Sequence, residues 1–357
     1  MRGRKLTPED IPAAVRGGAI LGGGGGGGLQ LGLELAEMAL SAGDLFLVPP
    51  EQVSPELTVI TCSLVGAPAA TRARVLPDDF LRAVRLLMDV AGLRAEEVGL
   101  ISNENGAAAT VNGWFQAAAL GLPLVDIPCN GRAHPLGIMG AMGLERCEGY
   151  RSLQVAVGGD RSAGAHLEMT VSAAPGAASA LIREAADRAG GLVAVARNPV
   201  SAAHALEHGA PGAISQAIDV GRAWLEADPG ARVAGAAEVL GGFHAGSGVL
   251  QAVEIETRGG FDVGLAVVTT GDGQLDIPIL NEYMALRAAS GQLAVFPDLV
   301  NVFDSDCRPL SSAELGDRVG ERVDVTWVPR ENLRLGSGAR DAAHLDECER
   351  LLGVKLR

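Results

Sequence analysis

A helix enclosed by two short strands, between residues 98 and 126, constrains the fold of this chain more than any other stretch. The apolar run 98–101 predicts a buried strand, and the Ala-rich segment 107–120 predicts a helix that ends at Gly121. Residues 122–126 predict a second short strand. A helical crossover of this kind normally places its two strands side by side in one sheet.

Polar residues follow each of these strands. Residues 102–106 come directly after the first strand, and residues 126–135 come after the second. Ligands of open α/β sheets bind in the crevice beyond the carboxyl ends of the strands. We therefore expect both polar segments to face one crevice, with Glu104 and Arg132 meeting there.

Helices and strands continue to alternate on either side of this unit. Helices are expected at 31–42, 78–91, 178–189, 200–207 and 214–227, and strands at 19–21, 57–62, 153–157, 168–173 and 192–196. The alternation predicts an α/β domain over residues 1–228, whose mostly parallel sheet is covered by helices on both faces.

The pattern changes at Asp228-Pro229-Gly230. Two alternating segments, 249–257 and 261–269, flank Gly259-Gly260 and predict a hairpin. Further short strands are expected at 292–296, 300–303 and 322–328. Residues 229–335 therefore predict a small, closed or nearly closed β domain. A last helix, within residues 336–357, is expected to pack back on the first domain.

Seven consecutive glycines, residues 22–28, follow the short apolar run 19–21. A strand, a glycine loop and a helix can bind an anion through backbone N–H groups, which makes Gly24, Gly25 and Gly26 candidate ligand-binding residues. A close-approach turn with a purely structural role explains the glycines equally well. Seven glycines satisfy the dinucleotide fingerprint trivially, so that match carries little information.

The loop 126–135 gathers Asp126, Cys129, Arg132 and His134 within nine positions. Asp, Cys and His bind transition metals, so Asp126, Cys129 and His134 are the available ligands for at most one divalent ion. Cys with His can also form an activated thiolate. In a structural alternative, Asp126 caps the next segment, Arg132 pairs with an acid and His134 binds a carbonyl group.

Glu104 is the best candidate for a general base, and Asp126 is the second candidate. Asn103 and Asn105 flank Glu104 and can donate hydrogen bonds to a developing negative charge. Asn112, eight residues further, can reach the same ligand or face solvent. A neighbouring arginine is expected to lower the pKa of Glu104 and keep it ionised at neutral pH.

Composition excludes several classes of protein. A net charge of −14 argues against nucleic acid as a partner, because phosphate binding needs a basic surface. We find no apolar run near 20 residues and no hydrophobic signal core at the N-terminus, so we expect a cytoplasmic protein that spans no membrane. The five cysteines form no CxxC pair, which indicates neither a zinc knuckle nor a disulfide framework.

Four stretches together resemble the S-methyl-thiohydantoin desulfurase family, in the order in which that family carries them. They are Gly18-Ala19-Ile20-Leu21 with the glycines that follow, the segment 102–135 with its Gly131-Arg132-Ala133, the pair Asn281-Glu282, and Phe296-Pro297-Asp298-Leu299. The resemblance implies a three-layer α/β/α domain that carries a β-barrel-like domain. It also implies that Asn281, Glu282 and Asp298 approach the crevice between them, whereas the bare sequence allows a strand end and a turn.

The loop 126–135 departs from the family pattern, which resembles D-x-D-x-x-G-R-A-F-P. This chain keeps Asp126, the Gly-Arg-Ala run and Pro135, but it lacks the second acid and has His134 in place of the aromatic residue. The departure suggests an altered substrate.

The resemblance favours a hydrolase that acts on a small five-membered cyclic substrate, such as an S-substituted thiohydantoin or a hydantoin-like ring. Water would attack the ring carbon, helped by Glu104 or Asp126, while Arg132, His134 and the glycine loop complete the site. One alternative is a non-catalytic or regulatory subunit that partners a hydantoinase or oxoprolinase-type enzyme. Another is a nucleotide-binding protein that uses the glycine loop. We expect a homo-oligomer, with a hydantoinase-type enzyme as a further candidate partner.

Overall fold

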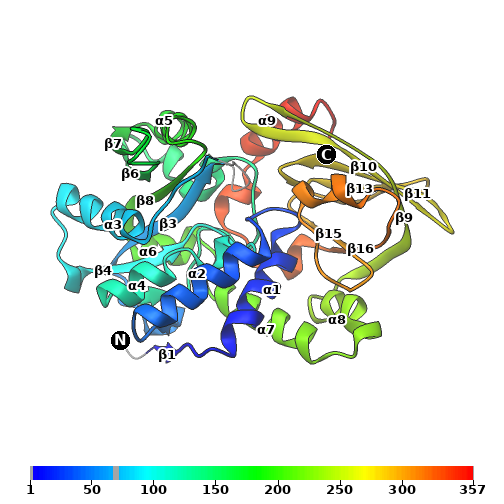
Figure 1. The fold of residues 1–357 in the computed structure, drawn as a ribbon, viewed down its shortest axis with the longest axis horizontal. Helices are drawn as coiled ribbons and strands as arrows, with labels where there is room; N and C mark the ends of the chain where they lie inside the picture. The colour runs from blue at the N-terminus through cyan, green and yellow to red at the C-terminus, as the bar shows by residue number, and fades with distance from the viewer. Residues whose placement is uncertain (1–2, 67–71, 357) are drawn as a thin grey trace.

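The chain forms a two-domain α/β protein, seen here in a computed structural model that describes residues 3–66 and 72–356 (Figure 1). Within these residues, the first sheet contains eight strands. In spatial order they are β1 (Arg4–Lys5), β2 (Phe46–Val48), β5 (Leu124–Val125), β4 (Val98–Ser102), β3 (Thr58–Gly66), β8 (Leu192–Ser201), β6 (Ser152–Gly158) and β7 (Leu167–Ala173).

The first sheet is mixed, so the prediction of a mostly parallel sheet is wrong. Strands β2, β5, β4 and β3 run parallel to one another, whereas β8 pairs antiparallel with both β3 and β6, and β7 pairs antiparallel with β6. The turn between β6 and β7 is short and can join antiparallel strands only. Alternating helices and strands indicate crossovers but leave the direction of each strand open.

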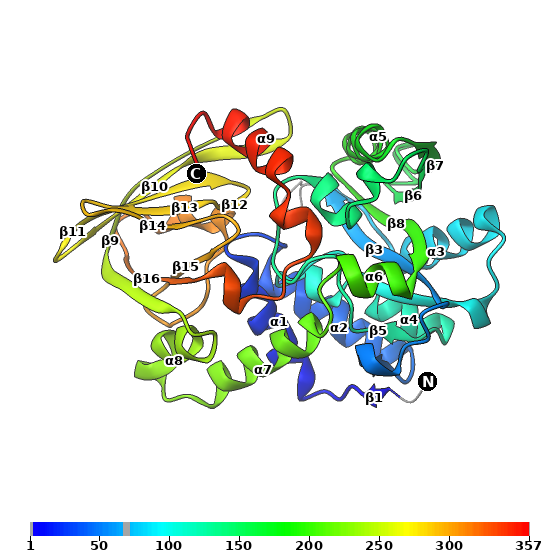
Figure 2. The same cartoon turned by 180° about the vertical axis from the view of Figure 1, so that it is seen from behind.

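Helices pack on this sheet from several directions (Figures 1 and 2). They are α1 (Asp10–Gly22), α2 (Leu29–Ala42), α3 (Pro77–Ala91), α4 (Trp114–Leu120), α5 (Pro175–Arg188), α6 (Ala202–His208) and α7 (Ala213–Glu226). Helix α8 (Arg232–Val239) packs instead on α7 and on the second sheet. In α3, Phe80, Val84 and Leu87 form the buried face, and Asp79 accepts a hydrogen bond from the backbone of Leu76 at the helix start. The predicted amphipathic helix is therefore confirmed.

Two predicted elements are wrong. Residues 19–21 form the last turn of α1 and not a strand, because Ile20 and Leu21 pack on α7 within one apolar cluster. The predicted helix 107–120 is limited to α4, preceded by a 3₁₀ turn at Ala109–Val111. Asn112 is extended and Gly113 has a φ of 88°, which separates the two segments.

The second sheet is antiparallel and curls into a half-barrel. In spatial order its strands are β14 (Gly291–Val295), β13 (Ala285–Ala288), β11 (Gly273–Leu280), β10 (Phe261–Thr270), β9 (Phe243–Arg258), β16 (Arg322–Val328) and β15 (Leu299–Phe303), with β12 (Glu282–Tyr283) paired to β11. The predicted hairpin is confirmed as β9 and β10, and both Gly259 and Gly260 have positive φ at its turn. Leu250, Ile277 and Val325 belong to the core of this half-barrel.

The terminal helix α9 (Ala342–Leu352) contacts β10 and β11 of the second sheet (Figure 1). Its Leu345 and Cys348 share one apolar cluster with Leu136 and Met139, which come from the loop after β5. The C-terminal segment therefore contacts both domains. No helix in the described part of the chain is long and apolar enough to cross a membrane.

Candidate functional site

The glycine loop lies at the seam between the two domains. On one side, the carbonyl groups of Gly23 and Gly24 accept hydrogen bonds from the backbone N–H groups of Tyr283 and Ser312, both at 2.9 Å. On the other side, the carbonyl group of Gly26 accepts from Ala108 and Ala109, at 3.0 and 2.9 Å. The loop thus ties the first domain to the second through its own backbone.

Side chains cannot be accommodated at Gly24, Gly25 and Gly26, in the middle of this loop. A Cβ atom on Gly25 would lie 2.2 Å from Oε1 of Glu282, and one on Gly26 would lie 2.4 Å from Cα of Gly106. A Cβ atom on Gly24 would meet the ring of Tyr283 at 2.8 Å. Close approach therefore explains the glycines, and it places the loop directly against the buried carboxyl group of Glu282.

The predicted context of the loop is wrong, because it follows helix α1 and not a strand. The hollow beside Gly24, Gly25 and Gly27 measures about 10 Å³. That volume is about the space for one water molecule. A nucleotide does not fit there.

Glu104 and His134 form the centre of the candidate site. Glu104 follows β4, and its Oε2 lies 3.0 Å from Nε2 of His134. The same oxygen accepts hydrogen bonds from the backbone of His134 and from the side chain of Asn103, both at 3.3 Å. The side chain of Glu104 is 13% exposed and that of His134 is 2% exposed, so the pair is almost enclosed.

The pKa of Glu104 is raised to about 8, which contradicts the expected lowering. Burial is the largest cause, and it outweighs the opposing charges of Arg197 and Arg132. Burial likewise lowers the pKa of His134 to about 3. At neutral pH the imidazole is therefore neutral, and the shared proton lies mainly on Glu104.

Arg132 brings a buried positive charge to this pair. Its Nη1 donates to the carbonyl groups of Pro297 and Asp298, and its guanidinium lies 4.5 Å from the ring centroid of Phe296. Burial lowers the pKa of Arg132 to about 10, whereas the charges of Glu282, Asp298 and Glu104 raise it. The charges of Arg132 and Glu104 each shift the pKa of the other group.

Glu282 contributes a second buried carboxyl group from the other domain. Its pKa is raised well above the usual value, first by burial and then by the charge of Glu104, while Arg132 opposes the shift. Two carboxyl groups and one guanidinium thus interact across the seam, with Gly25 against the side chain of Glu282.

Arg197 is a site residue that the sequence interpretation missed. It lies on β8, is 4% exposed and donates from Nη2 to Oδ1 of Asn103. Asn103 in turn donates to Glu104, so Arg197 reaches the carboxyl group through one side chain. A single arginine after the apolar run 192–196 was the signal that could have identified it.

Several predicted site residues have structural partners elsewhere. Asp126 accepts hydrogen bonds from the backbone of Ile214 at 2.7 Å and from the hydroxyl of Ser215 at 2.6 Å, so it caps the start of α7. It also lines a surface groove of about 580 Å³ with Arg334. Glu104, Arg132 and His134 do not line this groove.

Asn105 and Asn112, which are also predicted to bind the ligand, are buried in the first domain. Asn105 donates to the carbonyl groups of Gly131 and Ala213, and Asn112 is buried between the 3₁₀ turn and α4. The side chain of Asn105 therefore links the loop after β4 to Gly131 and to the start of α7. Neither Asn105 nor Asn112 is a partner of Glu104, whose carboxyl group contacts Asn103 and His134.

In the second domain, Asn281 and Asp298 also hold the backbone in place. The side chain of Asn281 accepts from the backbone of Asp262 at 2.9 Å. The carboxylate of Asp298 pairs with Arg330 at 2.8 Å, while its backbone carbonyl group faces Arg132. Asp298 therefore contributes to the site through its main-chain carbonyl group and through its charge, which raises the pKa of Arg132.

The three residues expected to bind a metal do not converge. Asp126 caps α7, His134 contacts Glu104, and Cys129 lies 3.2 Å from the hydroxyl of Thr61. Burial raises the pKa of Cys129 to about 11, so its thiol stays protonated at neutral pH. Among the described residues, one group of three has ligand atoms within 4.8 Å of one another: Glu145, Asp341 and His344.

Several buried polar atoms around Glu104 have no hydrogen-bond partner within residues 3–66 and 72–356. They are Oγ of Ser102, Nη2 of Arg132, Nδ1 of His134, Nε of Arg197 and Oε2 of Glu282. Buried polar atoms are normally paired. A group of unpaired donors and acceptors at one seam is therefore typical of a site that a polar ligand or water completes.

These features define a class: a two-domain α/β protein with a buried carboxyl–histidine pair and two buried arginines where its domains meet. The S-Me-THD-like N-terminal domain matches residues 9–159, and the S-Me-THD-like C-terminal domain matches residues 174–336. The chain therefore belongs to the S-Me-THD-like family, which confirms the resemblance to S-methyl-thiohydantoin desulfurases.

A crystal structure of a protein from Chromobacterium violaceum, determined in a structural genomics programme, has a similar fold. It shares 19% sequence identity with this chain at a TM-score of 0.71, over 98% of this chain and 96% of that chain. At this identity the likeness concerns the fold. No curated protein matches the chain.

Proposed function

We propose that this protein hydrolyses a small five-membered ring that carries an S-substituted carbon, such as an S-alkyl thiohydantoin. The observation that supports the proposal best is the Glu104–His134 pair, which lies beside Arg132 and Arg197 in a chain of the S-Me-THD-like family. A carboxyl group with a pKa near 8 can both accept and return a proton close to neutral pH.

In the proposed reaction, ionised Glu104 takes a proton from water while the water oxygen bonds to the ring carbon. The electron pair of the C=N bond moves to the ring nitrogen, and a guanidinium group of Arg132 or Arg197 stabilises that charge. The C–S bond then breaks, and Glu104 returns its proton to the leaving thiolate. The proton of the new hydroxyl passes to the ring nitrogen, so the products are a ring carbonyl with its N–H group and a free thiol.

Other residues have positioning roles in this scheme. Asn103 and His134 fix the carboxyl group of Glu104 through hydrogen bonds, and the glycine loop closes the seam over Glu282. Asp126 is left out as a base, since α7 occupies both of its oxygens. Because Glu104 is almost enclosed, the proposed reaction requires an opening of the seam through which substrate enters.

Thiol release by the purified chain tests this proposal. With an S-methyl thiohydantoin as substrate, we expect turnover by the protein alone and a loss of ~100-fold or more for Glu104→Gln, the usual scale for a general base. Glu51→Gln is the matched control, because Glu51 is exposed in a 3₁₀ turn. Absence of turnover by the folded protein would favour the subunit alternative, in which a hydantoinase-type enzyme performs the reaction.

A further inference from the structure

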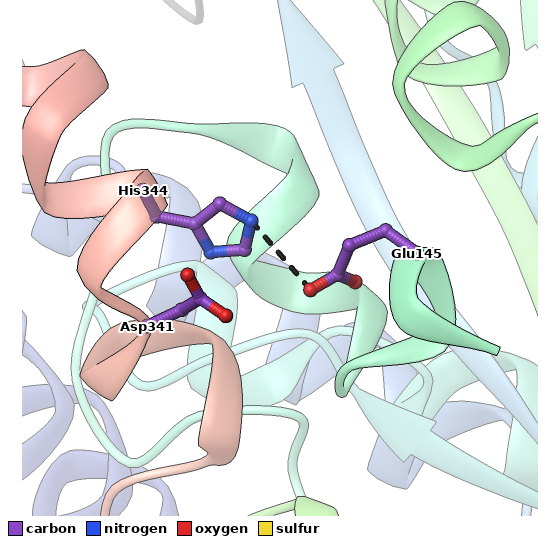
Figure 3. A group of neighbouring side chains, drawn as sticks. All are labelled: Glu145, Asp341 and His344. Carbon is purple, nitrogen blue, oxygen red and sulfur yellow. Dashed lines mark ion pairs between the residues drawn. The ribbon is translucent and has the colours of Figure 1, made fainter.

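A cluster outside the candidate site carries ligand groups with no assigned role (Figure 3). Glu145 lies in the 3₁₀ turn Leu144–Arg146, after the loop that carries His134. Both of its carboxylate oxygens are shielded from solvent, and neither has a hydrogen-bond partner in the described part of the chain. Such an arrangement is costly for a carboxylate unless a cation completes it.

His344, on the first turns of α9, is oriented towards this carboxylate. Its Nδ1 lies 2.9 Å from the carbonyl oxygen of Gly338, and the side chain is 10% exposed. A carbonyl group accepts only, so Nδ1 carries the hydrogen and the lone pair of the neutral ring is on Nε2. That Nε2 lies 3.6 Å from Oε1 of Glu145. A histidine that binds a metal is commonly held in this way.

Asp341 provides the third group. It is the N-cap residue of α9, and its Oδ1 accepts from the backbone of Ala343 at 2.8 Å. Its Oδ2 pairs with Arg146, which offsets one of the two negative charges. Ligand atoms of Glu145, Asp341 and His344 all lie within 4.8 Å of one another.

We propose that Glu145, Asp341 and His344 bind one divalent transition-metal ion of the zinc type. Zinc accepts carboxylate oxygens and imidazole nitrogens at about 2.0–2.2 Å, so two ligands of one tetrahedral ion lie roughly 3.4 Å apart. The 3.6 Å between Nε2 of His344 and Oε1 of Glu145 is close to that separation and longer than a hydrogen bond. Water occupies the position that these three groups leave open.

The ion holds together two segments that pack behind the Glu104–His134 pair. A Cβ atom on Gly338 would lie 2.0 Å from the carbonyl oxygen of Met139, so the segment before α9 packs tightly on residues 137–141. Residues 137–141 in turn pack on the candidate site: a Cβ atom on Gly140 would lie 2.2 Å from Oδ1 of Asn103 and 3.2 Å from Nε2 of His134. The metal site thus stabilises the two segments that pack behind the Glu104–His134 pair. The metal site does not depend on the proposed reaction.

Zinc binding to the full chain, stripped with a chelator and dialysed, tests the proposal. We expect one equivalent of Zn²⁺ to bind in calorimetry and to raise Tm in proportion to its occupancy. Glu145→Gln and His344→Gln should each weaken this binding by about 100-fold or more, since residues that merely orient ligands are worth ~10–100-fold. His208→Gln, on α6, and Glu347→Gln, on the outer side of α9, are matched controls and should bind as wild type.

The metal-free protein supplies a second measurement. Without zinc, Glu145→Gln should raise Tm, because it removes a negative charge whose two shielded oxygens have no hydrogen-bond partner among the described residues. With zinc in excess, the same variant should have the lower Tm. A plain ion pair between His344 and Glu145 predicts a lower Tm for the variant in both conditions and no shift with zinc. That result, or zinc binding that survives both substitutions, would overturn the proposal.

Discussion

The carboxyl group of Glu104 lies near two guanidinium groups, yet its pKa is raised to about 8. Arg132, which the sequence predicts beside Glu104, and Arg197, which it does not, both oppose this shift. Removing the carboxylate from water costs more free energy than their charges return. The same imbalance holds for Glu282. At the residue scale, burial therefore decides which groups at the seam carry a proton.

Glu282 gives a stability prediction with a definite sign. Below its ordinary pKa of 4.5, Glu282 is protonated in both the folded and the unfolded chain. As the pH rises above that value, the unfolded chain loses the proton first, so the contribution of Glu282 to the free energy of unfolding decreases until its raised folded pKa is passed. In Glu282→Gln no carboxyl group titrates at this position, so the free energy of unfolding does not decrease with pH for this reason.

We therefore expect Glu282→Gln to match the wild type at pH 4 and to have the larger free energy of unfolding at pH 9, because burial raises the pKa of the wild-type carboxyl group. Urea unfolding at the two pH values measures the difference. Glu254→Gln, an exposed position on β9, is the control. A variant that is less stable than the wild type at pH 9 would mean that Glu282 is ionised and well paired in the folded protein.

The polar residues of the site were partly predictable from the sequence. The sequence predicts Glu104 and Arg132 as candidates because polar segments after two consecutive strands meet at one edge of a sheet. Arg197 was missed because β8 had been expected to end at residue 196, and the antiparallel strand carries its arginine to the same edge. The pKa of Glu104 was predicted in the wrong direction, since sequence shows a neighbouring charge but not the depth of burial.

At the scale of elements, the short apolar run before the glycine loop can form either a strand or the end of a helix. The run Ala19-Ile20-Leu21 is too short to distinguish a strand from a helix end by periodicity. Packing on α7 decides the outcome, since Gly17 and Gly221 bring the two helix backbones into close contact. The prediction of helices such as α3 and α7 succeeded because their apolar stripes are long. Helices over both faces of the first sheet, in three layers, stay a prediction.

The loop also gives a paired substitution test. Gly25→Val places side-chain atoms where the carboxyl group of Glu282 lies, so it should displace Glu282 and reduce kcat/KM by ~10-fold or more, the scale of a lost positioning contact. Gly28→Ala is the matched control, because Gly28 has an extended conformation and nothing lies within 4 Å of its added Cβ atom. Melting temperatures are measured in parallel.

If Gly25→Val and Gly28→Ala have equal activity, the loop has no part in the site. If Gly25→Val unfolds at 25 °C while Gly28→Ala does not, the loop serves folding alone.

At the scale of the whole molecule, the site exists because two domains meet. Glu104, Arg132, His134 and Arg197 come from the first domain, and Glu282 comes from the second. The glycine loop and the carbonyl groups of Pro297 and Asp298 join these parts. The sequence indicated two domains from its change of pattern after residue 228, but the curl of the second sheet and the seam itself depend on long-range packing.

The pH dependence of kcat/KM tests the central claim most directly, namely that a Glu104 made weakly acidic by burial is the base. The ionised form is the active one in the proposed reaction, so kcat/KM for an S-methyl thiohydantoin should rise with pH and level off above about 8. In Glu104→Gln the residual activity should lose this rise. A wild-type profile that is already level from pH 5 to 9 would contradict the account, because it would mean that the base ionises with an ordinary carboxyl pKa.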